Sequence, residues 1–231
     1  DAIIGLAPDR LALFGYAHVP WMARRQSLID AATLPDVAER QALAAQAREA
    51  LLAAGYVAVG IDHFARPDDS MAIAAADGTL RRNFQGYTTD QAKALLGFGA
   101  SAIGYTPRGF IQNLSATAAW REAVEAGKLP IQRGAALSLD DRMRAQVIYA
   151  LLCRFAVDLD ALRERFGDLA GPVIRQAKLL ERDAPAGSLV PLSDGRAGFE
   201  IAPAWRERTR LIASVFDVYL QSSAKRHSLA V

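Results

Sequence analysis

The stretch RRNFQGYTT, residues 81–89, carries the side chains of this chain that are best suited to recognising a ligand. Arg81 and Arg82 can each grip a carboxylate with a planar fork of N–H donors. The aromatic faces of Phe84 and Tyr87 can pack on a flat ring. Together these residue types favour a flat ligand that carries several carboxylates.

The neighbouring residues leave a second interpretation open. Gly86 permits a tight bend of the backbone, which a binding loop and an ordinary surface loop can both use. The amide side chains of Asn83 and Gln85 can satisfy each other in a solvated loop without any ligand. The residues alone do not decide between a binding loop and a solvated one.

A second polar segment, FGYAHVP at residues 14–20, follows a run that predicts a buried strand. Tyr16 is expected to form part of the wall of a site. His18 is expected either to donate a hydrogen bond to a substrate or to be held by a neighbour at the strand end. An aromatic strand that ends in His-x-Pro occurs in many folds, so this segment is a weak indication by itself.

A third polar segment begins at Asp62, where another predicted strand ends. Adjacent side chains of an extended chain point in opposite directions, so we do not expect Asp62 and His63 to form an acid–base pair. Asp62 is expected instead to hold Arg66 or an amide of the loop. Pro67 biases Arg66 towards an extended conformation, which suits an arginine that projects into a cleft. No second histidine or cysteine lies at ligand spacing from His63, so we expect no metal site in this chain.

Composition excludes several classes of protein. Twenty-seven basic and twenty-five acidic residues give a net charge of +2, which does not favour nucleic acid or an anionic membrane as a partner. The single cysteine, Cys153, excludes an internal disulfide or an iron–sulfur site built from this chain alone, and we expect it to be an inert buried thiol. No membrane span or leader segment is evident, so we expect a cytoplasmic protein.

The first half of the chain predicts alternating strands and helices. Strands are expected at residues 10–17 and 56–61, with a long helix at about 35–54 between them. This order predicts a parallel pair of strands joined by a right-handed crossover. A short helix is expected at 68–76 and a third strand at 95–104, whose glycines indicate a close approach of the backbone to something.

A barrel of alternating strands and helices binds its ligands at the C-terminal ends of the strands. In this chain those ends are expected at residues 17–18, 62–63 and 103–104. We therefore expect three distant segments to meet at one site.

The second half predicts a more helical arrangement. Helices are expected at residues 140–157, 159–166 and about 169–182, followed by a hairpin around Asp194-Gly195. A last helix is expected at about 205–220. Three helices and a hairpin resemble a winged-helix unit.

Residues 62–89, DHFARPDDSMAIAAADGTLRRNFQGYTT, and the segment FGYAHVP resemble signature segments of oxygen-independent coproporphyrinogen III oxidase. This is a radical S-adenosylmethionine enzyme of haem synthesis, and the resemblance covers nearly the whole chain but only the C-terminal half of such an enzyme. It implies an α/β fold. Residues 1–130 would be the C-terminal part of a partial TIM-like (β/α) radical S-adenosylmethionine barrel, and residues 131–231 a mostly helical, winged-helix-like domain.

The resemblance also implies cofactors and roles. The family binds two S-adenosylmethionine molecules per active site, and the residues here that match its contacts are Ala17, Phe84, Gln85 and Ile103. Its 4Fe-4S cluster is bound by a Cys-x3-Cys-x2-Cys motif that would lie upstream of Asp1 and is absent here. Candidates for binding the substrate, coproporphyrinogen III, are Tyr16, His18, Arg66, Arg81, Arg82, Asn83 and Tyr87. No catalytic residue is assigned, and the pattern is lost after Gly104.

The implied activity is oxidative decarboxylation of two propionates of coproporphyrinogen III to vinyl groups, which gives protoporphyrinogen IX. This half is expected to be inactive alone. One alternative is a haem chaperone-like relative, which lacks the NFQGYTT motif as that group is known. Another is a winged-helix interaction module, but the helix GPVIRQAKLLERD is poor in basic residues, so we expect no nucleic-acid partner.

Overall fold

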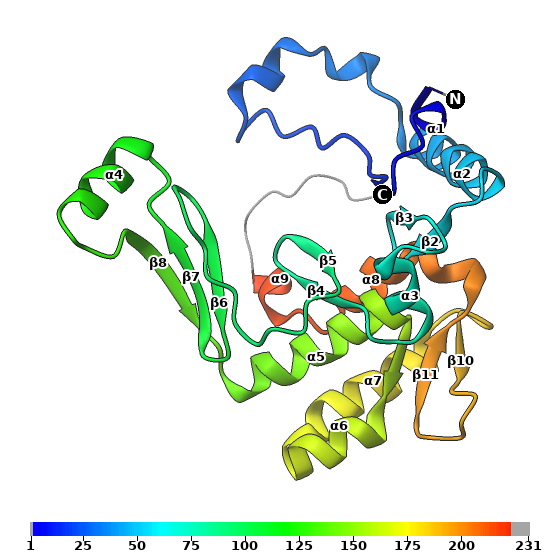
Figure 1. Ribbon diagram of the computed structural model, residues 1–231. Coiled ribbons are helices and arrows are strands. Elements are labelled where there is room, and N and C mark those ends of the chain that lie inside the picture. Colours follow the sequence, from blue (N-terminus) through cyan, green and yellow to red (C-terminus); the bar gives the residue numbers. More distant parts are fainter. Residues whose placement is uncertain (1, 223–231) are drawn as a thin grey trace. The chain divides into compact units, whose positions relative to one another are not determined.

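The computed structural model describes residues 2–222 and has an α/β fold (Figure 1). The chain divides into two compact units. The first comprises Asp1–Leu80 together with Asp217–Val231, and the second comprises Arg81–Phe216.

The first unit holds one small sheet and its helices. Its elements are α1 (Ala2–Gly5), β1 (Arg10–Ala12), 3-10 turns at Arg24–Leu28 and Ala31–Thr33, α2 (Val37–Ala53), β2 (Val57–Val59), β3 (His63–Ala65), α3 (Ser70–Ala76) and α9 (Val218–Ser222). The strand order is β1-β3-β2, and both pairings are antiparallel. Leu51, Tyr56 and Phe64 form a small core in this unit.

Helix α2 confirms the helix predicted at residues 35–54, with a later start. Asp36 is its N-cap, and the side chains of Asp36 and Glu39 form a reciprocal capping box with backbone N–H groups. Pro35 therefore precedes the helix instead of occupying its first turn. Gly55 follows the last turn with a φ of 88°, which is the left-handed conformation that glycine adopts most easily.

The predicted parallel pair of strands is wrong in its pairing. β1 and β2 do run in the same direction, but β3 lies between them and is antiparallel to both. The chain turns back at Gly60, where φ is 59°, and residues 63–65 form the central strand. β1 is also short, because the backbone from Leu13 onward leaves the sheet.

The second unit contains the rest of the elements. They are β4 (Arg81–Asn83), β5 (Gly86–Thr88), β6 (Ile103–Thr106), β7 (Gly109–Asn113), α4 (Thr117–Glu125), β8 (Ile131–Ala136), α5 (Leu139–Arg154), β9 (Ala156–Asp158), α6 (Leu159–Phe166), a 3-10 turn (Gly167–Ala170), α7 (Gly171–Asp183), β10 (Leu189–Pro191), β11 (Gly198–Ile201), a 3-10 turn (Pro203–Arg208) and α8 (Thr209–Ser214). They form the sheets β4-β5, β6-β7-β8 and β10-β11-β9.

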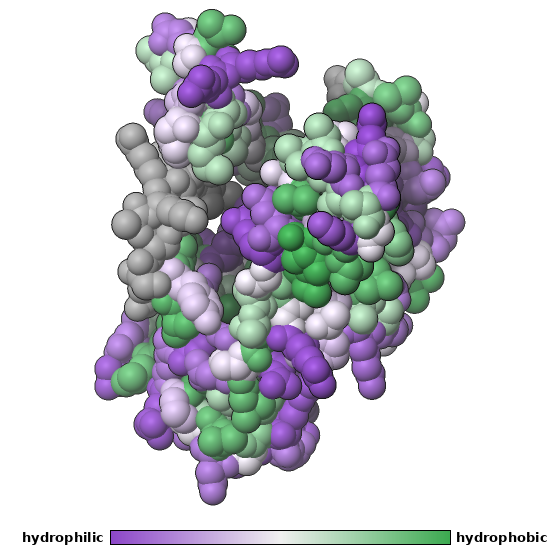
Figure 2. Space-filling model, turned by 90° about the vertical axis from the view of Figure 1, so that its left-hand side faces the viewer, coloured by the Kyte–Doolittle hydropathy of each residue, from purple (hydrophilic) through white to green (hydrophobic). Residues whose placement is uncertain are grey.

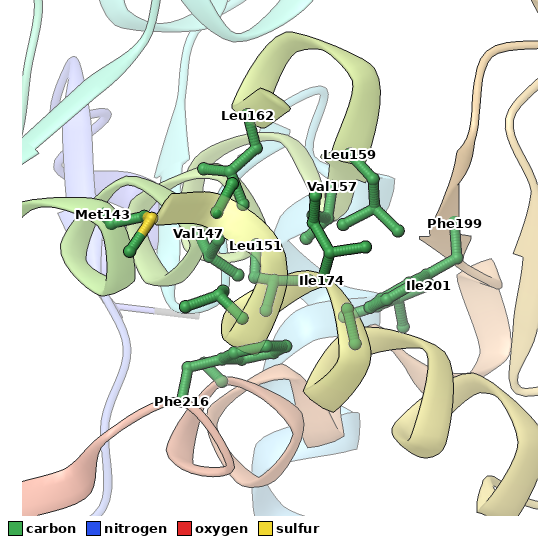
Figure 3. Close-up of a cluster of buried hydrophobic side chains, with 14 residues drawn as sticks. Met143, Val147, Leu151, Val157, Leu159, Leu162, Ile174, Phe199, Ile201 and Phe216 are labelled. Carbon is green, nitrogen blue, oxygen red and sulfur yellow. The ribbon is translucent and has the colours of Figure 1, made fainter. Parts of the chain in front are cut away.

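The hydrophobic core of the second unit is built around α5 (Figure 3). Val147 and Leu151 on this helix are almost completely buried, and they belong to one cluster with side chains of α6, α7, β9, β11 and the segment around Phe216. The helices predicted at 159–166 and 169–182 are confirmed, with α7 beginning at Gly171, and so is the hairpin formed by β10 and β11. The helix predicted at 140–157 ends earlier, at Arg154, because Phe155 adopts a left-handed conformation and Ala156–Asp158 form β9.

Two other predictions need correction. The strand expected at 95–104 begins only at Ile103. The glycines of this stretch do allow a close approach between backbone segments. A Cβ on Gly97 would lie 2.9 Å from the carbonyl carbon of Ile103, and one on Gly104 would lie 3.0 Å from the backbone oxygen of Leu95. The helix expected at 205–220 is divided, since Asp217 accepts hydrogen bonds from the backbone N–H groups that begin α9.

Replacing Leu151 by alanine should lower the free energy of unfolding by about 3 kcal/mol, because the side chain is fully buried and leaves a cavity. Urea unfolding followed by circular dichroism measures the change. Leu211→Ala is the matched control, since Leu211 is 66% exposed and its replacement should change stability by less than about 0.5 kcal/mol. Equal losses in the two variants would contradict this assignment of the core.

Candidate active site

The RRNFQGYTT motif forms a β-hairpin, which corrects the loop expected through Thr89. β4 and β5 pair antiparallel with Arg82 opposite Tyr87, and the two residues of the turn are Phe84 and Gln85. Gly86 leaves the turn with a φ of 137°, a conformation available to glycine and rarely to other residues. The motif therefore presents two specific side chains at the tip of a small regular element.

The tip of the hairpin is exposed and locally ordered. Phe84 is 63% exposed, and Gln85 is exposed beside it. The side-chain oxygen of Asn83 accepts a hydrogen bond of 2.9 Å from the backbone N–H of Gln85. The expected Asn83–Gln85 contact therefore exists, but it uses the backbone of Gln85 and leaves its side-chain amide available.

The two arginines of the motif have different surroundings. Arg81 is exposed, and its Nη1 donates to the backbone oxygen of Gln91 at 2.9 Å. The guanidinium carbon of Arg82 lies 4.6 Å from the centre of the Tyr87 ring, and among the described residues its buried Nη1 has no hydrogen-bond partner. Arg81 is thus the more accessible cation for an anionic ligand.

Tyr87 is attached to helix α5. Its side chain is buried, and its hydroxyl donates a hydrogen bond of 2.7 Å to the backbone oxygen of Leu152. The structure thereby gives Tyr87 an anchoring role within the second unit. A direct contact between Tyr87 and a substrate stays a prediction.

Ile103 lies in the same unit as the hairpin. It is half-buried and opens strand β6, where it stands opposite Gln112 of β7, so it lies at the start of a strand and not at the expected strand end. A contact with S-adenosylmethionine at this position stays a prediction.

The FGYAHVP segment leaves the sheet of the first unit beside Asp62. There the backbone N–H of Leu13 donates a hydrogen bond of 2.7 Å to the backbone oxygen of Asp62. The segment has no regular structure but is held from the side. The Gln26 side chain donates to the Ala17 oxygen at 3.1 Å and accepts from the Val19 N–H at 2.6 Å. Ala17 is thus fixed through its backbone, as a residue that contacts a ligand by its main chain needs to be.

The aromatic and histidine side chains of this segment contact each other. The hydroxyl of Tyr16 lies 3.3 Å from Nδ1 of His18. This contact supports the interpretation in which His18 is held by a neighbour, and it also fixes the orientation of the ring for a ligand.

Asp62 and His63 correct the expectation that adjacent side chains point apart. The His63 Nδ1 lies 2.7 Å from the Asp62 carboxylate, and both side chains are largely shielded from solvent. The reason is that Asp62 belongs to the turn before β3, so the backbone is not extended there. Arg66 is exposed, and its Nη1 lies 3.4 Å from the Ala7 oxygen.

The candidate residues fall into both units. Ala17, His18 and Arg66 belong to the first unit, whereas the hairpin and Ile103 belong to the second. Within the first unit, the FGYAHVP segment starts next to the turn at Asp62. The meeting of all three segments at one site stays a prediction.

Helix α5 brings further titratable groups near the hairpin that sequence analysis overlooked. Burial raises the pKa of Tyr149, and Tyr105 adds to this effect, while Arg82 opposes it. The sequence does not indicate that Tyr149 lies near Tyr105 and Arg82, because these residues are far apart along the chain and only the fold brings them together.

Among residues 2–222, no group of three His, Cys, Asp or Glu side chains is placed to hold a metal ion. No helix in the same part of the chain combines the length and apolar character needed to cross a membrane.

Comparison with known proteins gives related sequences over nearly the whole chain. Over 225 residues, 97% of the chain, it is 46% identical to the oxygen-independent coproporphyrinogen III oxidase of Cereibacter sphaeroides, and it covers 49% of that protein. It is 44% identical to the enzyme of the same name from Bradyrhizobium diazoefficiens, with 98% of the chain and 50% of the relative covered. No family model matches the chain.

The structure of coproporphyrinogen III oxidase (HemN) from Escherichia coli, described as a radical SAM enzyme, superimposes with a TM-score of 0.84 and 35% identity. The match covers 94% of this chain and 50% of that chain. The chain is thus similar in sequence and in fold to oxygen-independent coproporphyrinogen III oxidases. It spans about half the length of the curated relatives it matches and corresponds to the C-terminal half of HemN.

Cys153 should react slowly with thiol reagents while the chain is folded. Burial in α5 raises the pKa of Cys153 to about 11, so at pH 8 about one thiol in a thousand is ionised, against about a quarter for an ordinary cysteine. Reaction with a thiol reagent at pH 8 should therefore be at least about 100-fold slower in buffer than in denaturant. The absorbance of the released thiolate measures both rates, and equal rates would contradict the burial.

Proposed function

We propose that this chain supplies the substrate-positioning half of an oxygen-independent coproporphyrinogen III oxidase, which converts two propionates of coproporphyrinogen III to vinyl groups in haem synthesis. The observation that carries the proposal is the exposed Phe84–Gln85 tip, built on a hairpin in a chain 46% identical to such an enzyme. We also propose a cytoplasmic location, which the use of a single cysteine in this sequence supports.

The residues of the two units fit S-adenosylmethionine better than they fit an iron–sulfur cluster. The exposed ring of Phe84 offers a face for the adenine, and the Gln85 amide offers both a donor and an acceptor. Cys153 is the only cysteine and is buried, so the 4Fe-4S cluster would be bound by another segment. When bound, the cluster and two S-adenosylmethionine molecules supply the radical chemistry.

The remaining side chains can hold the substrate. Arg81 and Arg66 are exposed cations that can donate to propionates, whereas Arg82 is held closer to α5. Tyr16, His18 and Asn83 are further candidates for polar contacts with the substrate, and Ala17 and Ile103 are candidates for contacts with S-adenosylmethionine. These residues bind and orient the substrate and exclude water, which is the protein's contribution to a cofactor-driven reaction.

We further propose that residues 1–130 form the C-terminal part of a TIM-like barrel and residues 131–231 a winged-helix-like domain. Apolar residues reach the surface between hydrophilic ones (Figure 2). Met22 and Leu28 are 77% and 88% exposed, an arrangement that favours coverage by another segment. The cluster-bearing half of a relative is the segment that the proposal assigns to this surface.

The function is tested by joining this chain to the upstream half of the Cereibacter sphaeroides relative. The chimeric enzyme should load its cluster and release carbon dioxide from coproporphyrinogen III under anaerobic conditions. A chimera that loads the cluster but releases none contradicts the proposed function. Tight haem binding without turnover would instead support a haem chaperone-like protein.

In the chimeric enzyme, Phe84→Ala and Gln85→Ala should each lower turnover at least about tenfold, because each removes a contact to the cofactor, which amounts to about 1.4 kcal/mol. Thermal unfolding should change little, since both side chains are exposed. Phe98→Ala is the matched control, because Phe98 is an 88% exposed phenylalanine of the same unit outside the proposed site. Unchanged turnover in both test variants would remove the hairpin from the site.

Arg81→Ala should weaken binding of the tetracarboxylate by about ten- to hundredfold, or about 1.5–3 kcal/mol for a charge-assisted contact. Titration with coproporphyrin III, the stable oxidised analogue, measures the affinity by fluorescence. Arg182→Ala is the control, since Arg182 is an exposed arginine of α7 paired with Asp183. An equal loss in the two variants would indicate a general charge effect and not a propionate contact.

A further inference from the structure

The β4-β5 hairpin cannot hold its own tip in place. Each strand has three residues, and the two strands form a sheet of their own. An isolated two-stranded hairpin is marginally stable in water. The exposed side chains of Phe84 and Gln85 add no burial at the tip. The position of the tip therefore depends on contacts made by the residues behind it.

The strongest of these contacts joins Tyr87 to the end of helix α5. Leu152 lies in the last turn of α5, and its backbone oxygen has no helical N–H four residues further along the chain, because β9 begins at Ala156. The Tyr87 hydroxyl donates to this oxygen at 2.7 Å, and the ring is buried at 7% exposure. The bond thus satisfies an oxygen that the helix leaves unpaired, and it does so away from solvent.

Arg82 reinforces the same attachment. It stands opposite Tyr87 in the register of the hairpin, and its guanidinium lies over the Tyr87 ring. The positive charge also lies near the C-terminal end of α5, which is the negative end of the helix dipole. β4 itself packs against α5.

Helix α5 is a rigid support for this attachment. Leu151, the neighbour of Leu152, is fully buried in the core, and Val147 one turn earlier is almost fully buried (Figure 3). A displacement of the Leu152 oxygen would therefore disturb close-packed side chains. The chain of contacts runs from the core through α5 and Tyr87 to the tip of the hairpin.

We propose that Tyr87 is a positioning residue, which holds Phe84 and Gln85 at a fixed height above α5 through its bond to the Leu152 oxygen. This inference rests on the proposed function, because it assigns the tip to the cofactor pocket. This role requires no contact of Tyr87 with substrate or cofactor. It acts by keeping the tip in the one arrangement that the reaction needs.

The test compares Tyr87→Phe with Tyr56→Phe, two changes that remove the same group. Tyr56 is also 7% exposed, and its hydroxyl donates to the Pro8 oxygen, likewise at 2.7 Å, in the first unit. Both variants lose one buried hydrogen bond and should lose similar stability in thermal unfolding. Of the described hydrogen bonds that the two changes remove, only that of Tyr87 joins the hairpin to α5.

Hydrogen–deuterium exchange of this chain measures the attachment directly. In Tyr87→Phe, the peptide that covers residues 81–89 should exchange about five- to tenfold faster, while peptides of α6 and α7 stay protected. In Tyr56→Phe, the hairpin peptide should exchange as in the unchanged chain. Equal hairpin exchange in all three proteins would overturn the inference, and so would an equal acceleration in both variants.

Turnover of the chimeric enzyme, normalised to cluster content and measured well below the unfolding temperature, supplies the second measurement. Tyr87→Phe should lower kcat about tenfold and leave the KM for coproporphyrinogen III within about twofold, whereas Tyr56→Phe should lower neither. Faster hairpin exchange with unchanged kcat would contradict the positioning role and leave the proposed function intact. Unchanged turnover in Phe84→Ala and Gln85→Ala would instead remove the hairpin from the site, and a cluster-loaded chimera without turnover would contradict the proposed function itself.

Discussion

The C-terminal end of α5 is the constraint on which the second unit depends. One face of this helix carries Val147 and Leu151 into the core, and its last turn offers backbone oxygens that the helix cannot pair. Phe155 ends the helix in a left-handed conformation and lets β9 begin at once. The hairpin of the candidate site uses the oxygen of Leu152. The last turn of α5 therefore packs the core through Leu151, holds the hairpin through Leu152 and ends the helix at Phe155.

Local signals predicted the elements that local interactions decide. Helix α6 has the predicted bounds, because Asp158 caps it with a hydrogen bond to the Ala161 N–H and its apolar spacing matches one buried face. The start of α5 was predicted to within one residue, because a capping box at Ser138 fixes it. Its end was predicted three residues too late, because β9 is set by pairing with the distant strand β11. The strand β3 was missed, since three residues between two longer apolar runs carry no period of their own. Its place in the sheet is set by pairing with β1, more than fifty residues earlier.

The candidate site shows the same division. The residue types of RRNFQGYTT indicated that this stretch recognises a ligand, and exposure of Phe84 agrees with a side chain that has a partner to meet. The sequence could not separate the two arginines, because only the hairpin register brings Arg82 over Tyr87. It could not pair Asp62 with His63 either, since that contact depends on a turn in the backbone. Contacts across the fold decided both cases.

Burial of the chain's single thiol has a consequence for the chemistry proposed here. Sulfur–hydrogen bonds are weak, so a thiol readily gives its hydrogen atom to a carbon-centred radical and ends that radical's reaction. Cys153 is enclosed by α5 and its neighbours, with an exposure of 6%. In a protein that guides radicals, enclosing this thiol would keep it from ending the reaction, and the helix that encloses Cys153 also accepts the Tyr87 hydrogen bond that attaches the hairpin.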